Sequence, residues 1–222
     1  MQIKICGLTD VNEAEYLNRN HVDYAGFVLF FEKSRRNLTI AQAKPIMEAL
    51  SPEIKKVAVT VSPTVEQVRQ IRDAGFDYVQ VHGVLQPEIP DVMPVLKAFN
   101  LTDMDRFSEY EKCAGIKGYV FDSAEPGSGR TFDWNLLKEL PRGGKLFLLA
   151  GGLHAGNVAE AIRTVQPDGV DVSSGVEYDR PEGEETEMCS GKETKERAPK
   201  GKDPAKVDLF VRSVREVSQD NS

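Results

Sequence analysis

Cysteine and long apolar runs are scarce in this chain. Its 222 residues include three cysteines, Cys6, Cys113 and Cys189, with neither C-x-x-C nor Cys/His metal spacing. An odd count with this spacing argues against a disulfide scaffold or a structural zinc site and favours a reducing compartment. No apolar run approaches the ~18 residues that span a bilayer, and the N-terminus lacks a signal-peptide pattern. We therefore expect a soluble, cytoplasmic protein.

Basic charge is also in deficit. Lys and Arg total 28 against 35 Asp and Glu, which gives a formal net charge of -7. Such a chain exerts no long-range attraction on phosphate backbones or anionic lipids, so we expect no nucleic acid and no membrane as partners. Any anionic ligand must be held by local groups.

Short aliphatic or β-branched runs alternate with amphipathic stretches almost from end to end. The predicted strands are residues 2–6, 23–29, 54–60, 77–81, 93–97, 117–122, 145–149 and 168–172. The predicted helices are residues 10–19, 40–50, 64–74, 155–165 and 204–217. Eight strand-helix units in this length predict an α/β fold, a (β/α)8 TIM barrel in a single domain over residues 1–222. The first strand-helix turn has no G-x-G-x-x-G, which disfavours a doubly wound dinucleotide-binding sheet.

Residue types at the segment ends refine this prediction. Thr9 or Asp10 could cap the first helix, Thr39 the second, and Ser62 or Thr64 the third, and Pro204 fits a first helical turn. Three prolines in residues 84–94 predict a fourth helix of one or two turns at most. Residues 179–203 hold eight acidic and six basic side chains and predict a charged, mobile insertion, in which Cys189 would be an ordinary thiol.

In a barrel the ligand lies at the carboxyl ends of the strands, so polar residues there are the candidates for chemistry. Cys6 ends the first strand and Asp122 the sixth, and an acid and a base on opposite sides of the mouth would suit an isomerase acting on a small sugar phosphate. Cys6 could equally be a small buried hydrophobe. Asp122 ends an apolar run, where a carboxylate is costly unless it faces the pocket.

Small residues follow the last two strands. Gly151 and Gly152 come after the seventh strand, and Ser173 and Ser174 after the eighth, where many barrels bind phosphate through backbone amides. The alternative for the glycine pair is a simple tight turn.

Three further side chains are candidates for substrate binding, each with an alternative. Arg36 could bind a second anion or be a surface charge. His82 could be an alternative acid or base, or a hydrogen-bonding wall residue. Asp171 could point at the substrate amine or a hydroxyl, or could be buried while holding the Ser173 or Ser174 amides.

Motifs at these positions resemble the phosphoribosylanthranilate isomerase family, which are (β/α)8 enzymes of tryptophan biosynthesis. They are KICGLT at 4–9, AGFV at 25–28, KSRR at 33–36, VQVHG at 79–83, VFD at 120–122, PGSGRTFDW at 126–134, LAGGL at 149–153 and VDVSSGVE at 170–177. Each motif is weak alone, but their order along the barrel is specific.

The resemblance implies roles for these residues. Cys6 would be the general base and Asp122 the general acid of an Amadori rearrangement that needs no metal or organic cofactor. Arg36 would pair with the anthranilate carboxylate, Asp171 would lie near the amine, and the Gly151, Gly152, Ser173 and Ser174 amides would hold the phosphate. The segment 127–129 looks like the family's mobile loop over the site.

Two departures and two alternatives accompany the resemblance. About twenty extra residues follow Glu177, and the fourth helix is curtailed. A related isomerase acting on a histidine-pathway aminoaldose is one alternative, although such barrels favour two aspartates where this chain has Cys6. A non-catalytic sugar-phosphate binding protein is the other. The family includes monomers and homodimers, and the sequence decides between neither.

Overall fold

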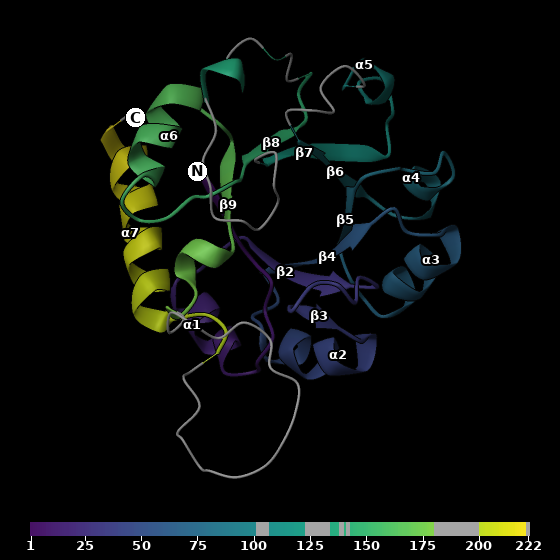
Figure 1. The fold of residues 1–222 in the computed structure, drawn as a ribbon, viewed down its shortest axis with the longest axis horizontal. Coiled ribbons are helices and arrows are strands. Elements are labelled where there is room, and N and C mark those ends of the chain that lie inside the picture. The colour runs from purple at the N-terminus through teal and green to yellow at the C-terminus, as the bar shows by residue number, and fades with distance from the viewer. Residues whose placement is uncertain (101–106, 123–133, 138–139, 141–142, 180–199, 221–222) are drawn as a thin grey trace.

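The structure, a computed structural model, has a closed ring of parallel strands at its centre and helices around the outside (Figure 1). It describes every residue except 101–106, 123–133, 138–139, 141–142, 180–199 and 221–222. The ring strands are β1 (Gln2–Cys6), β2 (Tyr24–Leu29), β4 (Lys55–Val61), β5 (Tyr78–His82), β6 (Val95–Asn100), β7 (Ile116–Asp122), β8 (Leu146–Leu149) and β9 (Gly169–Val172). Because β1 pairs with both β9 and β2, the ring closes, and the short β3 (Asn37–Leu38) adds to β2 outside it. The predicted (β/α)8 barrel is confirmed.

Helices lie between successive ring strands. They are α1 (Glu13–Arg19), α2 (Ile40–Ala49), α3 (Val65–Asp73), α4 (Ile89–Val92), α5 (Phe107–Tyr110), α6 (Val158–Val165) and α7 (Pro204–Asp220), with 3-10 turns η2 (Trp134–Leu137) and η3 (Ser174–Val176). The curtailed fourth helix and the start of α7 at Pro204 are as predicted. The sequence pattern does not predict α5, which at four residues is too short to produce a helical period. Among the helices described, none combines the length and apolar character that crossing a bilayer requires.

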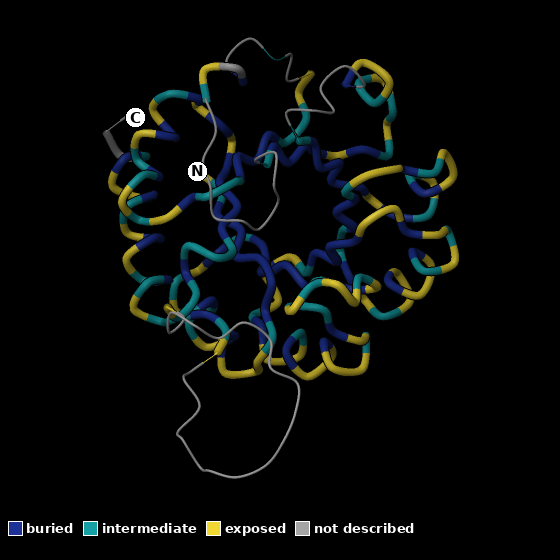
Figure 2. The backbone as a smooth tube through the Cα atoms, viewed as in Figure 1, coloured by how far each residue is buried: buried dark blue, intermediate teal, exposed yellow. Residues whose placement is uncertain are grey.

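Alternation along the strands separates two apolar cores. On β1, Ile3 and Ile5 face the helices and belong to the larger core, whereas Cys6 belongs to the smaller core inside the ring. The smaller core also contains Val57, Leu96 and similar residues from several strands. Figure 2 shows the consequence, a continuous buried ring surrounded by helices that are exposed on their outer faces. Inward-facing polar residues are therefore conspicuous.

Hydroxyl caps fix the starts of two helices. Thr39 and Thr64 each form a capping box, with Gln42 and Gln67 respectively, as the sequence predicts. For α1 the N-cap is Asn12, which makes no side-chain capping hydrogen bond, so neither Thr9 nor Asp10 occupies the N-cap position, although Asp10 Oδ1 accepts from Asn12 N at 2.9 Å. The buried carboxylate of Glu13 acts there instead and accepts hydrogen bonds from the backbone amides of Thr9 and Asp10 at 2.6 and 3.1 Å.

The two ends of the predicted insertion are held together. Glu177 and Lys202 form an antiparallel bridge, and Tyr178 N donates to Gly201 O at 3.3 Å. The buried Lys202 amide also donates to Glu13 at 2.6 Å, which anchors this stem to the start of α1. Residues 180–199, including Cys189, lie outside the described residues, so their mobility stays a prediction. The stem nevertheless returns the chain to the barrel at a defined point.

The capping box of α3 gives a test of the fold. Replacing Thr64 by Ala removes the hydroxyl that accepts from Gln67 N at 3.2 Å and should lower the free energy of unfolding by about 1 kcal/mol. Urea denaturation measures the change. Thr64→Ser keeps the hydroxyl and should stay within about 0.5 kcal/mol of the parent. Equal losses in the two variants would assign the effect to the threonine methyl group instead.

Candidate active site

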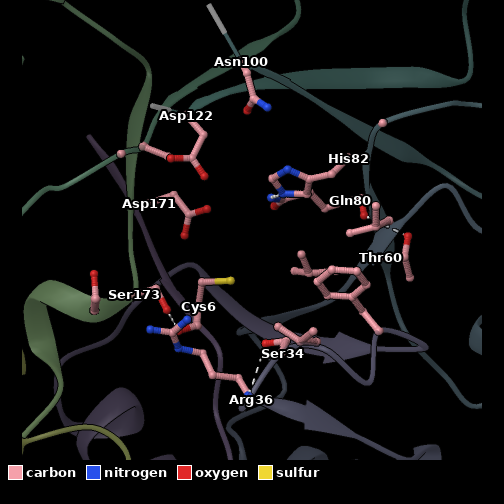
Figure 3. A pocket seen from close by; sticks show the side chains of 18 of the residues that line it. Cys6, Ser34, Arg36, Thr60, Gln80, His82, Asn100, Asp122, Asp171 and Ser173 are labelled. Atoms are coloured by element: carbon pink, nitrogen blue, oxygen red, sulfur yellow. Dashed lines mark hydrogen bonds between the residues drawn. The ribbon is translucent and has the colours of Figure 1, made fainter. Parts of the chain in front are cut away.

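The carboxyl ends of the strands surround a cavity of about 430 Å³. All nine residues singled out from the sequence line it, namely Cys6, Arg36, His82, Asp122, Gly151, Gly152, Asp171, Ser173 and Ser174. They come from strand ends or the loops that follow, and Figure 3 shows the labelled side chains converging on the same space. The barrel therefore brings together residues that are up to 168 positions apart in the chain (174 - 6).

Cys6 ends β1 and faces this cavity with 9% of its surface exposed. Its strand partner on β2 is Gly26, where a Cβ atom would lie 2.8 Å from Cys6 Sγ. The missing side chain at Gly26 thus leaves room for the thiol. Burial raises the pKa of Cys6, and the Lys4 and Lys202 ammonium groups oppose that rise. The thiol is therefore protonated at rest, and its ionisation depends on the charges around it.

Asp122 ends β7 and its carboxylate turns toward the same space as Cys6 (Figure 3). In the ring order β1, β9, β8, β7, its strand stands three places from β1, whereas the strand directly opposite β1 is β6. The prediction that the two groups stand on opposite sides of the mouth is thus corrected: they lie three strands apart around it. A ligand in the cavity can contact both groups at once.

His82 lines the cavity as a neutral side chain. Burial, with the positive charges of Lys97 and Lys4, lowers the pKa of His82 to about 3. Its Nε2 lies 2.9 Å from Gln80 Nε2, so the neutral ring accepts this hydrogen bond. An imidazole held neutral is a poor proton donor near pH 7. This geometry favours the wall-residue interpretation of His82 over the acid/base one.

The two carboxylate oxygens of Asp171 have different surroundings. Its Oδ2 accepts a hydrogen bond from Lys4 Nζ at 2.7 Å, and this ion pair is buried. Its Oδ1 is buried and has no hydrogen-bond partner among the residues described. The alternative in which Asp171 holds the Ser173 or Ser174 amides was wrong, because Asp171 Oδ2 accepts from Lys4 Nζ instead. One carboxylate oxygen remains for a donor from a ligand.

Arg36 is oriented by Glu177. Its Nε and Nη2 donate to the two Glu177 oxygens at 2.6 and 3.1 Å, and only 13% of its side chain is exposed. Glu177 also pairs with Arg35 and, at 3.0 Å, with Lys202. Burial raises the pKa of Glu177, but these cations outweigh it and the net shift is downward, so the carboxylate is ionised. Three cations around one anion leave a local excess of positive charge at the mouth.

The loops after β8 and β9 pack backbone to backbone. Gly175 makes this contact possible, because a Cβ atom there would lie 2.0 Å from Leu153 O. Gly151 and Gly152 both adopt positive φ, at 87° and 64°, a conformation in which glycine is favoured. Within the described part of the chain their amides donate to no other residue. Backbone amides that are left without partners in consecutive residues are the groups from which anion-binding sites are built.

Sequence reasoning missed several polar residues of the site. Gln80 and Asn100 line the cavity, and each has a buried side-chain oxygen with no hydrogen-bond partner among the described residues. Gln80 could have been found, because it stands two residues before His82 on the same face of its strand. Lys4 could have been found in the same way, because it stands two residues before Cys6 on its strand. Glu177 ends the motif at 170–177 but carries no sign of its ion pairs, because its partner Lys202 lies beyond the insertion.

The chain is similar along most of its length to known proteins of one family. A family model described as N-(5'-phosphoribosyl)anthranilate (PRA) isomerase matches residues 3–183. The N-(5'-phosphoribosyl)anthranilate isomerase of Listeria welshimeri is 35% identical over 224 residues, covering 98% of this chain and 100% of that protein. The crystal structure of phosphoribosyl anthranilate isomerase from Thermotoga maritima has a TM-score of 0.79 and 29% identity, covering 97% of this chain and 99% of that one. Another, in complex with reduced 1-(o-carboxyphenylamino)-1-deoxyribulose 5-phosphate, has a TM-score of 0.75, 27% identity and coverage of 97% and 99%.

The contact between Gly26 and Cys6 can be tested through thiol reactivity. With Cys113 and Cys189 replaced by Ser, Gly26→Ala should slow alkylation of Cys6 by iodoacetamide, because the new methyl group crowds Sγ. Gly118→Ala is the matched control: it overpacks the barrel against Leu146 at 2.8 Å and lies elsewhere on the ring. Both changes should cost about 1–3 kcal/mol of stability, but only the first should alter the alkylation rate. Equal slowing in both variants would contradict this assignment.

Proposed function

The chain belongs to the family of N-(5'-phosphoribosyl)anthranilate isomerases, and on that premise we propose that Cys6 and Asp122 are the base and the acid of its reaction. This reaction is the Amadori rearrangement of N-(5'-phosphoribosyl)anthranilate to 1-(2-carboxyphenylamino)-1-deoxyribulose 5-phosphate, an isomerisation in tryptophan biosynthesis. The observation that carries the proposal is that a thiol and a carboxylate reach one cavity from different strands.

The proposed chemistry begins with a proton transfer from Asp122 and continues with one to Cys6. Asp122 gives a proton to the furanose ring oxygen as its bond to C1' breaks, and the nitrogen lone pair forms the C=N bond of a protonated Schiff base. Cys6, as thiolate, then removes the proton from C2'. The electrons of that C–H bond form the C1'=C2' bond, and the C=N electrons return to nitrogen. Loss of the enol proton and protonation of C1' convert the resulting enolamine to the ketone.

This sequence requires no metal or organic cofactor. The substrate nitrogen accepts the electrons that a cofactor would otherwise take, so the protein has only to move protons and hold the ends of the substrate. The neutral state of His82 supports the choice of Asp122 as the acid, because an imidazole with a pKa of about 3 is deprotonated when the reaction runs.

Two anionic ends of the substrate need separate sites. Arg36 would bind the anthranilate carboxylate through the guanidinium donors that Glu177 leaves unused, in a region where cations outnumber anions. The amides of Gly151, Gly152, Ser173 and Ser174 would hold the phosphate. Asp171 Oδ1 would accept a hydrogen bond from the substrate amine. With both ends fixed, the sugar would lie between Cys6 and Asp122.

Removing either proposed catalytic group should abolish most activity. Cys6→Ala and Asp122→Asn should each lower kcat by about 10²–10⁴-fold, the usual contribution of general acid-base catalysis. Conversion of N-(5'-phosphoribosyl)anthranilate is followed by the loss of its fluorescence. Cys113→Ser and Asp208→Asn are matched controls outside the cavity and should retain near-native kcat. Near-native kcat in Cys6→Ala would mean that another group removes the C2' proton.

The pH dependence provides a second test. Because the reaction needs Cys6 as thiolate and Asp122 protonated, the active fraction of the enzyme falls once the pH exceeds the higher of the two pKa values. Burial raises the pKa of Cys6, so kcat/KM should be level through neutrality and decline only above the ordinary thiol pKa of about 8.5. His82 should add no inflection near neutrality, since its pKa is lowered to about 3. Steady-state rates across this range measure the profile. A decline of kcat/KM that begins well below about pH 8.5 would contradict a buried thiol as the base.

A further inference from the structure

A buried ion pair lies inside the barrel, directly behind the cavity. Lys4 and Asp171 face each other on the paired strands β1 and β9, with Nζ and Oδ2 2.7 Å apart. The Lys4 side chain is 0% exposed and that of Asp171 is 7% exposed. Lys4 stands two residues before Cys6 on the same inward face of β1, so the ammonium group lies in the layer beneath the thiol.

This pair occupies an otherwise apolar environment. The interior of the ring is built from residues such as Val57, Leu96, Val120 and Leu148. Removing two charges from water costs several kcal/mol each, and apolar residues of similar size often give equal or greater stability. Packing alone therefore gives no reason for a lysine here. The interactions of Lys4 with both Asp171 and Cys6 provide that reason.

We propose that Lys4 is a positioning residue whose ammonium group stabilises the ionised thiol of Cys6 and holds Asp171 with Oδ1 turned to the cavity. The inference rests on the proposed roles of Cys6 and Asp171. One side chain would then serve both partners: it binds Oδ2 of Asp171 and leaves Oδ1 for the substrate, and it supplies a positive charge next to the base.

The charges around Cys6 define what each substitution should do. Burial acts to lower the pKa of Lys4, but the charges and hydrogen bonds of Asp171 and Cys6 outweigh it, so Lys4 stays protonated. Among the groups facing Cys6, Lys4 on β1 and Lys202 before α7 favour the thiolate, and Asp171 on β9 disfavours it. Arg36, His82 and Asp122 line the same cavity, and burial with nearby cations lowers the pKa of His82 to about 3, so its ring adds no charge near the thiol. Loss of Lys4 would leave Lys202 alone to oppose Asp171 beside the thiol.

The experiment titrates the thiol directly. In a chain whose Cys113 and Cys189 are replaced by Ser, the rate of alkylation by iodoacetamide is measured against pH. Lys4→Met should move the midpoint of this titration to higher pH. At a fixed pH below the midpoint, each rise of the midpoint by one pH unit should make alkylation about tenfold slower. Asp171→Asn should move the midpoint downward, and the double variant should return it toward the parent value. The alkaline limb of kcat/KM should move with the midpoint in Lys4→Met.

Controls separate this role from a merely structural one. Lys97→Met removes another buried lysine of the barrel wall, one that binds backbone oxygens of Val81 and Ala98, and should leave the thiol midpoint unchanged. If Lys4→Met does not fold, comparing Asp171→Asn with the double variant still isolates the loss of the Lys4 charge, because these two proteins differ only at residue 4. An unchanged midpoint in Lys4→Met, or an upward move in Asp171→Asn, would overturn the inference.

The outcome is independent of the proposed catalytic role of Cys6. Alkylation reports the charge state of the thiol whether or not that thiol is the base. If Cys6→Ala is inactive but Lys4→Met leaves the midpoint in place, the inference about Lys4 fails alone. If Cys6→Ala keeps its activity, the proposed mechanism fails whatever the alkylation shows.

Discussion

Closure of the ring at β1 is the constraint on which the rest of the site depends. Because β1 pairs with β2 on one side and with β9 on the other, the first strand of the chain is locked between an early and a late one. Cys6, Gly26 and Asp171 become neighbours only through this closure. If the ring opened on either side of β1, one of two contacts would be lost: the Lys4–Asp171 pair on the β9 side or the crowded contact at Gly26 on the β2 side.

A second consequence concerns charge. The chain carries a net charge of -7, yet its cavity mouth gathers Arg35, Arg36 and Lys202 around a single carboxylate. Long-range and local electrostatics thus have opposite signs. The acidic surface disfavours polyanions, whereas fixed cations and backbone amides within a few ångströms suit a small molecule with two anionic ends. Glu177 orients the Arg36 guanidinium, and so determines where the carboxylate of a ligand would bind.

Much of this arrangement could be predicted from the sequence. The strands could be predicted because aliphatic runs alternate with helical patterns, and Cys6 and Asp122 because they end such runs. The four-residue α5, the helix start without a side-chain cap and the interior ion pair could not. Lys4 and Asp171 are 167 residues apart, so only the register of β1 against β9 brings them together. Glu177 and Lys202 depend in the same way on a bridge between distant residues.

The bridge between Glu177 and Lys202 also bears on how this barrel can change in length. The segment that joins Glu177 to Lys202 starts and ends at residues that are bridged to each other, so both of its ends are fixed. The entropy of closing such a connection grows only with the logarithm of its length, about 0.6 kcal/mol per doubling. Additional residues can therefore accumulate at this point with little effect on the rest of the fold. The same point is a natural place to graft a foreign peptide or a second domain onto the barrel.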